Sequence, residues 1–466
     1  MNTFFTFVNS VLITSLILLT SFSANSQAKT DDFATIKKHV DKIASHYVNL
    51  GWFSGSLLVA KDGVVFHQES FGYSNIASKT ENTVHTKYNI GSIVKNYTAV
   101  LILQQAENKK LYLTDTLDKF GLGFPKKIAS KITIHHLLHH RSGFADIFTA
   151  EYRQNQMSFN TIDKKLALLR ESPLLFEPGT DTKYSNYGYV VLGAILEKST
   201  GKSFETLLNE NILDKIDLVN TSFLPSNTDK NQSTRYTYTH KGHLVEVGIT
   251  EHAGPDGGIE STANDLQSFY RELFYGSKLL SRDKESFKEV FNNDGEHWGA
   301  YGGGLGVSAA IEVDLLSGFE IVVLANSDNL VAERISGRIL SFIKDGEHRP
   351  ITILPTNFAY QYYKKNGLEA FKKDFKLAYK KAEYEGFMGR PINELGMQLV
   401  KNHSWNEVFD ILNALVSFFP EAPQVYDSLA FAYFSKGEQS KAKSIFAKAK
   451  SLKPNFTSDY SADNYQ

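Results

Sequence analysis

The stretch Tyr88-Asn-Ile-Gly-Ser-Ile-Val-Lys-Asn-Tyr-Thr-Ala-Val100 places a serine and a lysine three positions apart, at Ser92 and Lys95. If Ser92 lies at the start of a helix, residue i+3 is on the same face, so the lysine amine points at the hydroxyl one turn away. A serine hydroxyl is a weak nucleophile until a neighbouring base removes its proton, and a desolvated lysine can do this. The pair therefore predicts a nucleophile and its base.

A second polar segment, Tyr184-Ser-Asn186, lies further along the chain. A tyrosine phenol close to the lysine amine can carry a proton to a leaving group, and an asparagine two residues later can hydrogen-bond the lysine or a substrate amide. The Ser-x-x-Lys spacing alone is a weak signal, because it arises by chance in most long chains. The surrounding segments must therefore decide whether Ser92 and Lys95 form a catalytic pair.

Three further segments frame these residues. Gly55-Ser-Leu-Leu-Val-Ala-Lys-Asp-Gly-Val-Val-Phe66 predicts a β-hairpin with its turn at Lys61-Asp-Gly63. Ile132-Thr-Ile-His-His-Leu-Leu-His-His-Arg-Ser-Gly143 is a histidine-rich segment that ends in the small residues Ser142 and Gly143. Phe176-Glu-Pro-Gly179 then precedes the Tyr184 segment.

From about Gly55 to Asn326 the chain resembles the serine beta-lactamase and penicillin-binding-protein superfamily, in particular its class C-like branch of esterases, D-amino-acid peptidases and carboxypeptidases. The resemblance implies an α/β (α+β) fold, with an antiparallel sheet flanked by helices and a helical subdomain. It also implies that Ser92 is the acylated nucleophile, Lys95 its base and Tyr184 the proton carrier. Asn186 would bind the substrate or Lys95, and no cofactor is expected.

The third element of the superfamily departs from its usual pattern here. It normally carries a lysine or histidine two positions before a glycine, on a strand where a backbone N–H completes the oxyanion hole. In the candidate, Trp298-Gly-Ala-Tyr-Gly-Gly-Gly-Leu-Gly-Val-Ser308, one register puts Ala300 at the cation's place, and an alternative uses His297. Glycines let the backbone approach a substrate closely. We expect Gly303 or its neighbour Gly302 to bind substrate through this N–H.

Four histidines in the predicted helix need a separate assignment. They include i, i+4 pairs, which on a helix can bind zinc. The sequence lacks the glutamate of an H-E-x-x-H arrangement, and the family resemblance places these histidines in a structural helix, so we expect no metal. These histidines are His135, His136, His139 and His140. A G-x-S-x-G nucleophile elbow, a P-loop and a dinucleotide fingerprint are absent from the sequence, which disfavours the enzyme classes that use them.

The N-terminal residues indicate export. Residues 1–28 contain no acidic residue, and the apolar stretch Val11-Leu-Ile-Thr-Ser-Leu-Ile-Leu-Leu19 is short for a membrane span. Ser26-Gln-Ala28 has small residues where a signal peptidase cleaves. We therefore expect a signal peptide over 1–28, a periplasmic or secreted protein and no stable membrane span after cleavage. The lack of lysine or arginine before the apolar stretch leaves an uncleaved anchor as the alternative.

The composition excludes some partners. The 466 residues include no cysteine, so neither a disulfide nor a lipid-attachment thiol is available. A net charge of -1 and a pI near 6.9 give no electrostatic reason to expect nucleic acid. A small-molecule or peptide substrate fits this composition.

The last part of the chain has a different character, and we expect a hydrolase domain over 29–350 and a helical domain over 351–466. Several residues recur after 34 positions, the period of tetratricopeptide repeats. The recurring pairs are Leu395 and Leu429, Ile411 and Ile445, and Pro420 and Pro454. So short an array serves equally well as a peptide-binding groove for a protein partner or as a structural support for the catalytic domain.

Two classes of function therefore compete. The first is an active serine hydrolase that forms an acyl-enzyme on an ester, a D-amino-acid peptide or a beta-lactam-like amide. The second is a catalytically weak penicillin-recognising or peptide-binding protein in which the repeats carry the function. The nucleophile and base favour the first, and the altered third element favours the second. Pocket shape decides the substrate, which stays open at this point.

Overall fold

The computed structural model describes residues 33–223, 230–249, 251–291, 295–384, 386–458 and 460. The expected signal peptide over 1–28 lies outside these residues. Within them, no helix combines the length and the apolar character needed to cross a membrane.

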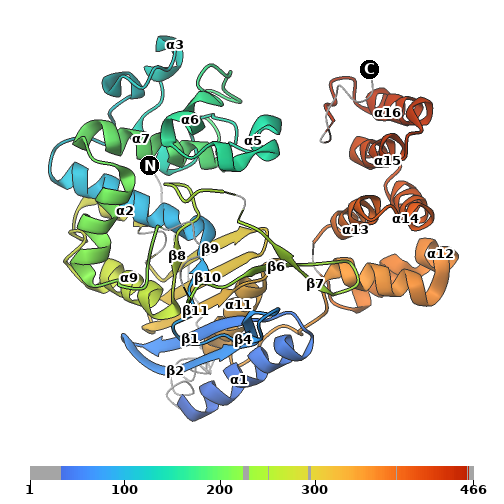
Figure 1. Ribbon diagram of the computed structural model, residues 1–466, viewed down its shortest axis with the longest axis horizontal. Helices are drawn as coiled ribbons and strands as arrows, with labels where there is room; N and C mark the ends of the chain where they lie inside the picture. Colours follow the sequence, from blue (N-terminus) through green and yellow to red (C-terminus); the bar gives the residue numbers. More distant parts are fainter. Residues whose placement is uncertain are drawn as a thin grey trace, which may run out of the picture.

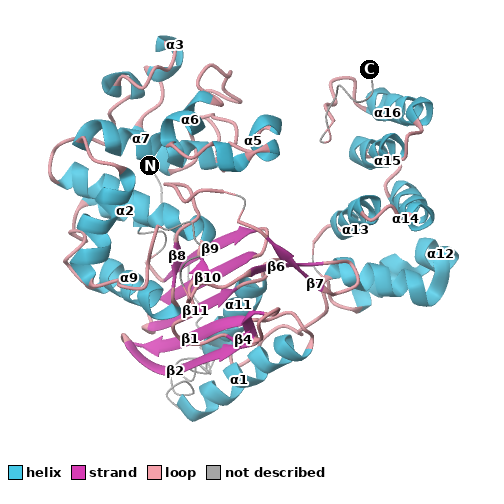
Figure 2. Ribbon diagram, viewed as in Figure 1, coloured by secondary structure: helices cyan, strands magenta, loops and turns pink. Residues whose placement is uncertain are grey.

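A five-stranded antiparallel sheet forms the centre of the larger part of the molecule (Figures 1 and 2). The strand order is β2-β1-β11-β10-β9, so strands from the two ends of this part pair directly. The expected first hairpin is confirmed, and its turn residues Asp62 and Gly63 have φ of 52° and 82°, which suits a tight two-residue turn. The strands are β1 (Gly55–Lys61), β2 (Val64–Phe71), β9 (His297–Gly304), β10 (Val307–Asp314) and β11 (Phe319–Ala325).

Alternate residues of the sheet face two separate cores, as the period of a strand requires. In β1, Leu57 and Val59 pack against α1 and α11, whereas Leu58 and Ala60 face the core that contains α2 and α9. The sheet is therefore covered by helices on both faces, and the predicted α/β (α+β) fold is confirmed. The covering helices are α1 (Phe33–Asn49), α2 (Val94–Glu107), α9 (Ala263–Tyr275) and α11 (Val331–Asp345).

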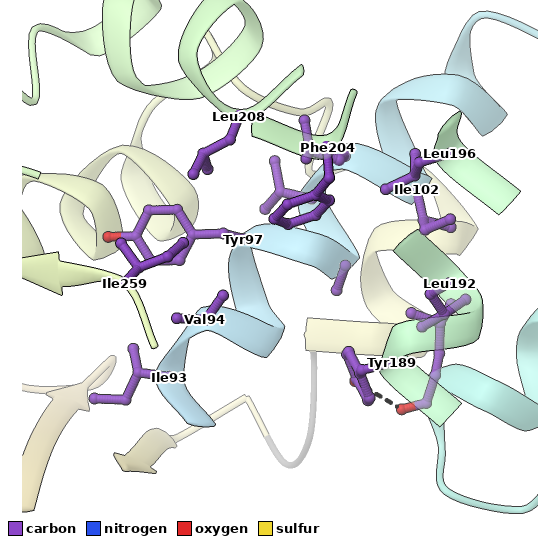
Figure 3. Close-up of a cluster of buried hydrophobic side chains, with 14 of the residues drawn as sticks. Ile93, Val94, Tyr97, Ile102, Tyr189, Leu192, Leu196, Phe204, Leu208 and Ile259 are labelled. Carbon is purple, nitrogen blue, oxygen red and sulfur yellow. Dashed lines mark hydrogen bonds between the residues drawn. The ribbon is translucent and has the colours of Figure 1, made fainter. Parts of the chain in front are cut away.

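Helix α2 is the central helix of the second core. Most of its residues are buried around the whole circumference, as is typical of a helix enclosed by its neighbours. Figure 3 shows Tyr97 and Ile102 of this helix among Leu192 and Leu196 of α7 and Phe204 of α8. The helices of this subdomain are α3 (Lys126–Ala129), α4 (Ile134–Leu138), α5 (Ala150–Gln154), α6 (Ile162–Ala167), α7 (Asn186–Thr200), α8 (Phe204–Leu208) and α10 (Glu285–Phe291).

Smaller elements connect the sheet and the helices. Three pairs of short strands are β3 (Tyr73–Asn75) with β4 (Thr80–Glu81), β5 (Tyr88–Asn89) with β8 (Glu260–Ser261), and β6 (Arg235–Tyr238) with β7 (Leu244–Val247). The short helical turns are η1 (Gly91–Ile93), η2 (Leu117–Phe120), η3 (Gln156–Ser158), η4 (Asn209–Leu213) and η5 (Asp214–Ile216).

The C-terminal part is helical, as expected, and occupies the orange to red region of Figure 1. Helices adjacent in sequence pack against each other around a core of their own. The first helix is kinked at Gly367, which has φ of 77° and ψ of 173°. The tetratricopeptide assignment stays a prediction. The helices are α12 (Pro355–Lys381), α13 (Gly389–Lys401), α14 (Trp405–Phe418), α15 (Pro423–Ser435) and α16 (Gln439–Leu452).

The helical part is attached to the sheet-containing part through the hairpin of β6 and β7. Asn357 at the start of α12 donates from Nδ2 to the backbone oxygens of Thr239 (3.3 Å) and His240 (2.8 Å). The ring of Tyr360 meets the His240 ring edge-on at 4.6 Å. Just before α12, Leu354 is buried in the core formed with α1 and α11. The linker therefore belongs to the packing of the larger part.

Candidate active site

Ser92 lies in the one-turn helix η1, immediately before α2, and Lys95 lies in the first turn of α2. Their side chains meet, with Nζ of Lys95 3.1 Å from Oγ of Ser92. Gly91 makes this tight turn possible, because its φ of 51° is a left-handed conformation that suits glycine. The Oδ1 of Asn89 accepts a hydrogen bond from the Gly91 N–H at 2.8 Å and so fixes the turn.

The second segment brings a phenol to the same hydroxyl. Tyr184 precedes α7, and its OH donates to Oγ of Ser92 at 2.7 Å. The following Ser185 caps α7 by accepting the N–H of Gly188 at 3.2 Å, which fixes where the helix begins. Tyr184 is 47% exposed, so part of this residue is open to solvent.

Asn186, the first residue of α7, contacts Lys95 from the other side. Its Oδ1 accepts from Nζ of Lys95 at 2.7 Å. The backbone oxygen of Asp256 also accepts from this Nζ, at 2.5 Å. The amine therefore has three oxygen neighbours, although Lys95 itself is only 5% exposed. Burial of a charged or polar amine is tolerated when each N–H has a partner, as here.

His140 is a further neighbour of the site. Its ring centroid is 4.4 Å from that of Tyr184, and its Nδ1 accepts the N–H of Ser185 at 3.2 Å. Burial, followed by the nearby Lys95 amine, lowers the pKa of His140 to about 4. The imidazole is therefore neutral at physiological pH and supports the Tyr184 segment without adding a positive charge.

The glycine-rich third element forms β9, an edge strand of the sheet (Figure 2). This strand contacts η1, the turn that contains Ser92. A Cβ on Gly302 would overlap the backbone oxygen of Ile90, and a Cβ on Gly91 would lie 3.0 Å from the backbone nitrogen of Gly303. Only glycine allows two backbones to approach so closely. The backbone of the strand thus lies against the turn that carries Ser92.

Ala300 and His297 occupy opposite faces of β9. Ala300 is buried in the core that contains α2, the helix that follows Ser92. His297 Nε2 instead lies 2.8 Å from Oε2 of Glu312. The same Glu312 carboxylate accepts from Ser336 of α11, at 2.9 Å. Successive residues of a strand alternate between faces, so His297 points away from the Ser92 side. The geometry favours the register with Ala300 at the place of the cation.

Two supporting groups were not identified from the sequence. Asp146 accepts hydrogen bonds from Nδ2 and from the backbone N–H of Asn186, each at 3.1 Å. The loop from Ala253 to Gly258 supplies the Asp256 oxygen that contacts Lys95. The Asp256 carboxylate is itself paired with Nζ of Lys165 at 3.2 Å, with both side chains nearly buried. The density of glycine and proline in this loop is the signal that could have drawn attention to it.

Residues 40–335 match the family model described as Beta-lactamase. The chain belongs to this family. Members of the family use a serine nucleophile with a lysine three residues later, the pattern that Ser92 and Lys95 form here. The predicted resemblance is thereby confirmed, and it covers most of the part that contains the sheet.

Individual relatives agree with this assignment. The chain is 26% identical over 281 residues to "Penicillin-binding protein 4*" of Bacillus subtilis (strain 168), covering 56% of this chain and 61% of the relative. It is 27% identical over 315 residues to "Protein flp" of Staphylococcus aureus (strain N315), covering 62% of this chain and 63% of the relative. The chain thus spans less than two thirds of these curated relatives.

Among solved structures, the octameric penicillin-binding protein homologue from Pyrococcus abyssi superposes with a TM-score of 0.60 and 25% identity. The superposition covers 72% of this chain and 82% of that protein. The sheet with its flanking helices is therefore the fold shared with penicillin-binding proteins.

Proposed function

We propose that this protein is a serine hydrolase that forms an acyl-enzyme on Ser92. One observation carries the proposal: Oγ of Ser92 lies 3.1 Å from the Lys95 amine and 2.7 Å from the Tyr184 phenol. A nucleophile held within hydrogen-bond distance of two groups that can exchange protons is the arrangement that acyl transfer needs.

The surroundings of Lys95 suit the role of base. A neutral amine has two N–H groups and one lone pair. The oxygens of Asn186 and Asp256 accept the two N–H bonds, at 2.7 Å and 2.5 Å, and the lone pair then faces the third neighbour, Ser92. As the Ser92 oxygen bonds to the substrate carbonyl carbon, its proton moves to Nζ of Lys95.

Tyr184 and Lys95 together complete the reaction in this scheme. Tyr184 gives its proton to the leaving oxygen or nitrogen as the scissile bond breaks, and Lys95 returns a proton to the phenol. Water then attacks the acyl-serine ester with the same groups working in reverse, which releases the acid and restores Ser92.

The negative oxygen that develops on the substrate carbonyl needs backbone donors. In support, a Cβ on Gly91 would lie 3.0 Å from the backbone nitrogen of Gly303, and Gly91 directly precedes Ser92 in the chain. We assign the oxyanion hole to the N–H groups of Ser92 and Gly303, with Gly302 as the residue whose lack of a side chain permits the approach. This corresponds to the substrate-binding role expected for both glycines.

Ala300 restricts the range of substrates that the site should hydrolyse well. Beta-lactams and peptides with a free C-terminus carry a carboxylate beside the scissile carbonyl, and a cation at the third element would bind it with a charge-assisted hydrogen bond of ~1.5–3 kcal/mol. Ala300 offers no such bond, and His297 lies on the opposite face of the strand. The preferred substrates are therefore simple esters, or amides without a neighbouring carboxylate, and beta-lactam turnover is weak.

The same residue supports a second candidate function. A beta-lactamase-family fold without the carboxylate-binding cation suits a catalytically weak penicillin-recognising or peptide-binding protein, whose C-terminal helices bind a protein partner. Export to the periplasm or beyond the cell, with cleavage after residue 28, is compatible with both candidates and rests on the sequence of residues 1–28.

Labelling of the active serine separates the two candidates. The protein is incubated with a fluorophosphonate or a fluorescent penicillin, and the labelled residue is located by peptide mass, with Ser92→Ala as the control. Turnover of a nitrophenyl ester is measured in parallel. We expect a label on Ser92 together with ester turnover. A label without turnover supports the second candidate, and a label that persists in Ser92→Ala excludes Ser92 as the nucleophile.

A further inference from the structure

Three side chains that are not part of the Ser92 site converge from two helices. His135 lies in α4, His139 follows at the end of the same helix, and Glu289 lies in α10. Nε2 of His135 is 2.9 Å from Oε1 of Glu289, and the two histidine rings are 4.5 Å apart between centroids. One nitrogen or oxygen from each of the three residues lies within 4.8 Å of the others.

His139 contributes a polar atom that the packing leaves unsatisfied. Its Nε2 is buried and has no hydrogen-bond partner among the described residues. A buried nitrogen without a partner carries a desolvation cost, and such atoms in a folded protein call for an explanation.

We propose that His135, His139 and Glu289 bind a zinc ion, with water as the fourth ligand. Two imidazoles and one carboxylate are a recognised ligand set for zinc, and zinc binds such atoms at ~2.0–2.2 Å. Tetrahedral ligands at that distance lie about 3.3 Å from one another, so small side-chain rotations are enough to close the group. The ion would give the buried Nε2 of His139 a partner. His135 and Glu289 would supply its other two protein ligands.

The arrangement also explains why the sequence alone disfavoured a metal. The i, i+4 histidines were visible, but the carboxylate comes from α10 and not from the same helix, so the H-E-x-x-H pattern is missing. A second group, Asp41, His67 and Glu69, is a weaker candidate for zinc, since it offers one histidine where the first group offers two. Imidazole-rich sets favour zinc over calcium and magnesium.

Bound zinc would link α4 to α10, two helices far apart in sequence. This role is independent of acyl transfer at Ser92, so neither proposal depends on the other. Because an ion that binds only the folded state stabilises it, zinc should raise the melting temperature of the full chain.

The experiment is a calorimetric titration of the chelator-treated full-length protein with zinc chloride. One zinc per chain is expected, together with a rise in melting temperature that magnesium chloride does not produce. His139→Asn and Glu289→Gln should each weaken binding by at least about tenfold. His85→Asn is the matched control, because His85 is an exposed histidine remote in sequence from this group, and it should bind zinc as the unmodified chain does.

Folding of each variant is checked by circular dichroism and thermal melting without metal, and Glu289→Gln replaces a partly exposed side chain with one of the same shape, so it should fold. Cobalt substitution gives a second measurement, since a tetrahedral nitrogen and oxygen site produces a visible absorption band. The proposal is overturned if the unmodified protein binds no zinc, or if His139→Asn and Glu289→Gln bind it with unchanged affinity.

Discussion

Both oxygens of the Asp146 carboxylate lie 3.1 Å from Nδ2 of Asn186. A carboxylate accepts hydrogen bonds and has none to donate, so the amide must turn its NH2 group toward Asp146. Its Oδ1 is then directed at Nζ of Lys95, at 2.7 Å. Asp146 therefore positions the amide oxygen that accepts an N–H of Lys95, the proposed base.

Replacement of Asp146 by asparagine should lower the rate of acylation. The new amide can face Asn186 in either orientation, so Oδ1 is no longer held toward Lys95. Loss of one charge-assisted hydrogen bond of ~1.5–3 kcal/mol corresponds to a roughly ten- to hundredfold decrease in the acylation rate. Single-turnover ester hydrolysis measures this rate, and the exposed Asp283→Asn is the control. An acylation rate equal to that of the control would show that Asp146 has no positioning role.

Ser92→Ala should abolish hydrolysis and leave the melting temperature nearly unchanged, since one hydroxyl at the start of α2 contributes more to chemistry than to packing. Lys95→Ala should be nearly as damaging, because residues that act as a unit do not lose rate independently. The double variant should lie within about tenfold of Ser92→Ala. Comparable turnover by Ser92→Ala would disprove the assignment of the nucleophile.

Tyr184→Phe removes only the oxygen that lies 2.7 Å from Ser92 and keeps the ring that packs on His140. We expect a loss on the order of 10²- to 10⁴-fold in kcat, the usual size of a general acid–base contribution. Stopped-flow measurement gives this loss for esters with different leaving groups. The loss should be smallest for nitrophenolate, which needs little protonation. Near-normal rates for all esters would assign the proton transfer to another group.

Ala300→Lys and Ala300→His test the missing cation. Each should raise kcat/KM on a chromogenic cephalosporin more than on a nitrophenyl ester, by up to the roughly ten- to hundredfold that a carboxylate clamp provides. His297→Ala should change both substrates alike, because His297 faces Glu312 on the other side of the sheet. A cephalosporin-selective loss in His297→Ala, or efficient cephalosporin turnover by the unmodified protein, would refute the assignment.

A chain that ends at Pro355 should still be labelled at Ser92. It keeps Leu354, which is buried beside α1 and α11, and loses only α12 to α16. Its solubility should fall, because the hairpin surface around His240 loses its contacts with Asn357 and Tyr360. Circular dichroism establishes folding before labelling. A folded truncated chain that takes no label would mean that the C-terminal helices form part of the site.

The sequence predicted the parts of the site that depend on local spacing. Ser92 and Lys95 are one helical turn apart, so their contact follows from helix geometry alone. Tyr184 required the family resemblance, because nothing local connects it to Ser92. The contacts of Asp146 and of the Asp256 oxygen were not predicted, since each is made by a loop whose path depends on tertiary packing.

The register of the third element, the strand β9, could not be fixed from the sequence alone. Only the extra loop residues that the His297 register demands counted against that register. The two registers differ by an odd number of residues. In a strand such a difference moves a side chain to the other face. The pairing of Ala300 with Ile311 and of His297 with Asp314 supplies the missing information, because Ile311 packs in the core that contains α2.

The pairing of β1 with β11 has a consequence for how the chain folds. Gly55 pairs with Ala325, so two adjacent strands of the sheet come from opposite ends of the sheet-containing part. Closing so long a loop is entropically costly, and chains rich in such distant contacts fold slowly. The helices α12 to α16 contact mainly their neighbours in sequence and should form sooner. Refolding from denaturant should therefore show a fast helical phase that precedes recovery of the acylable serine.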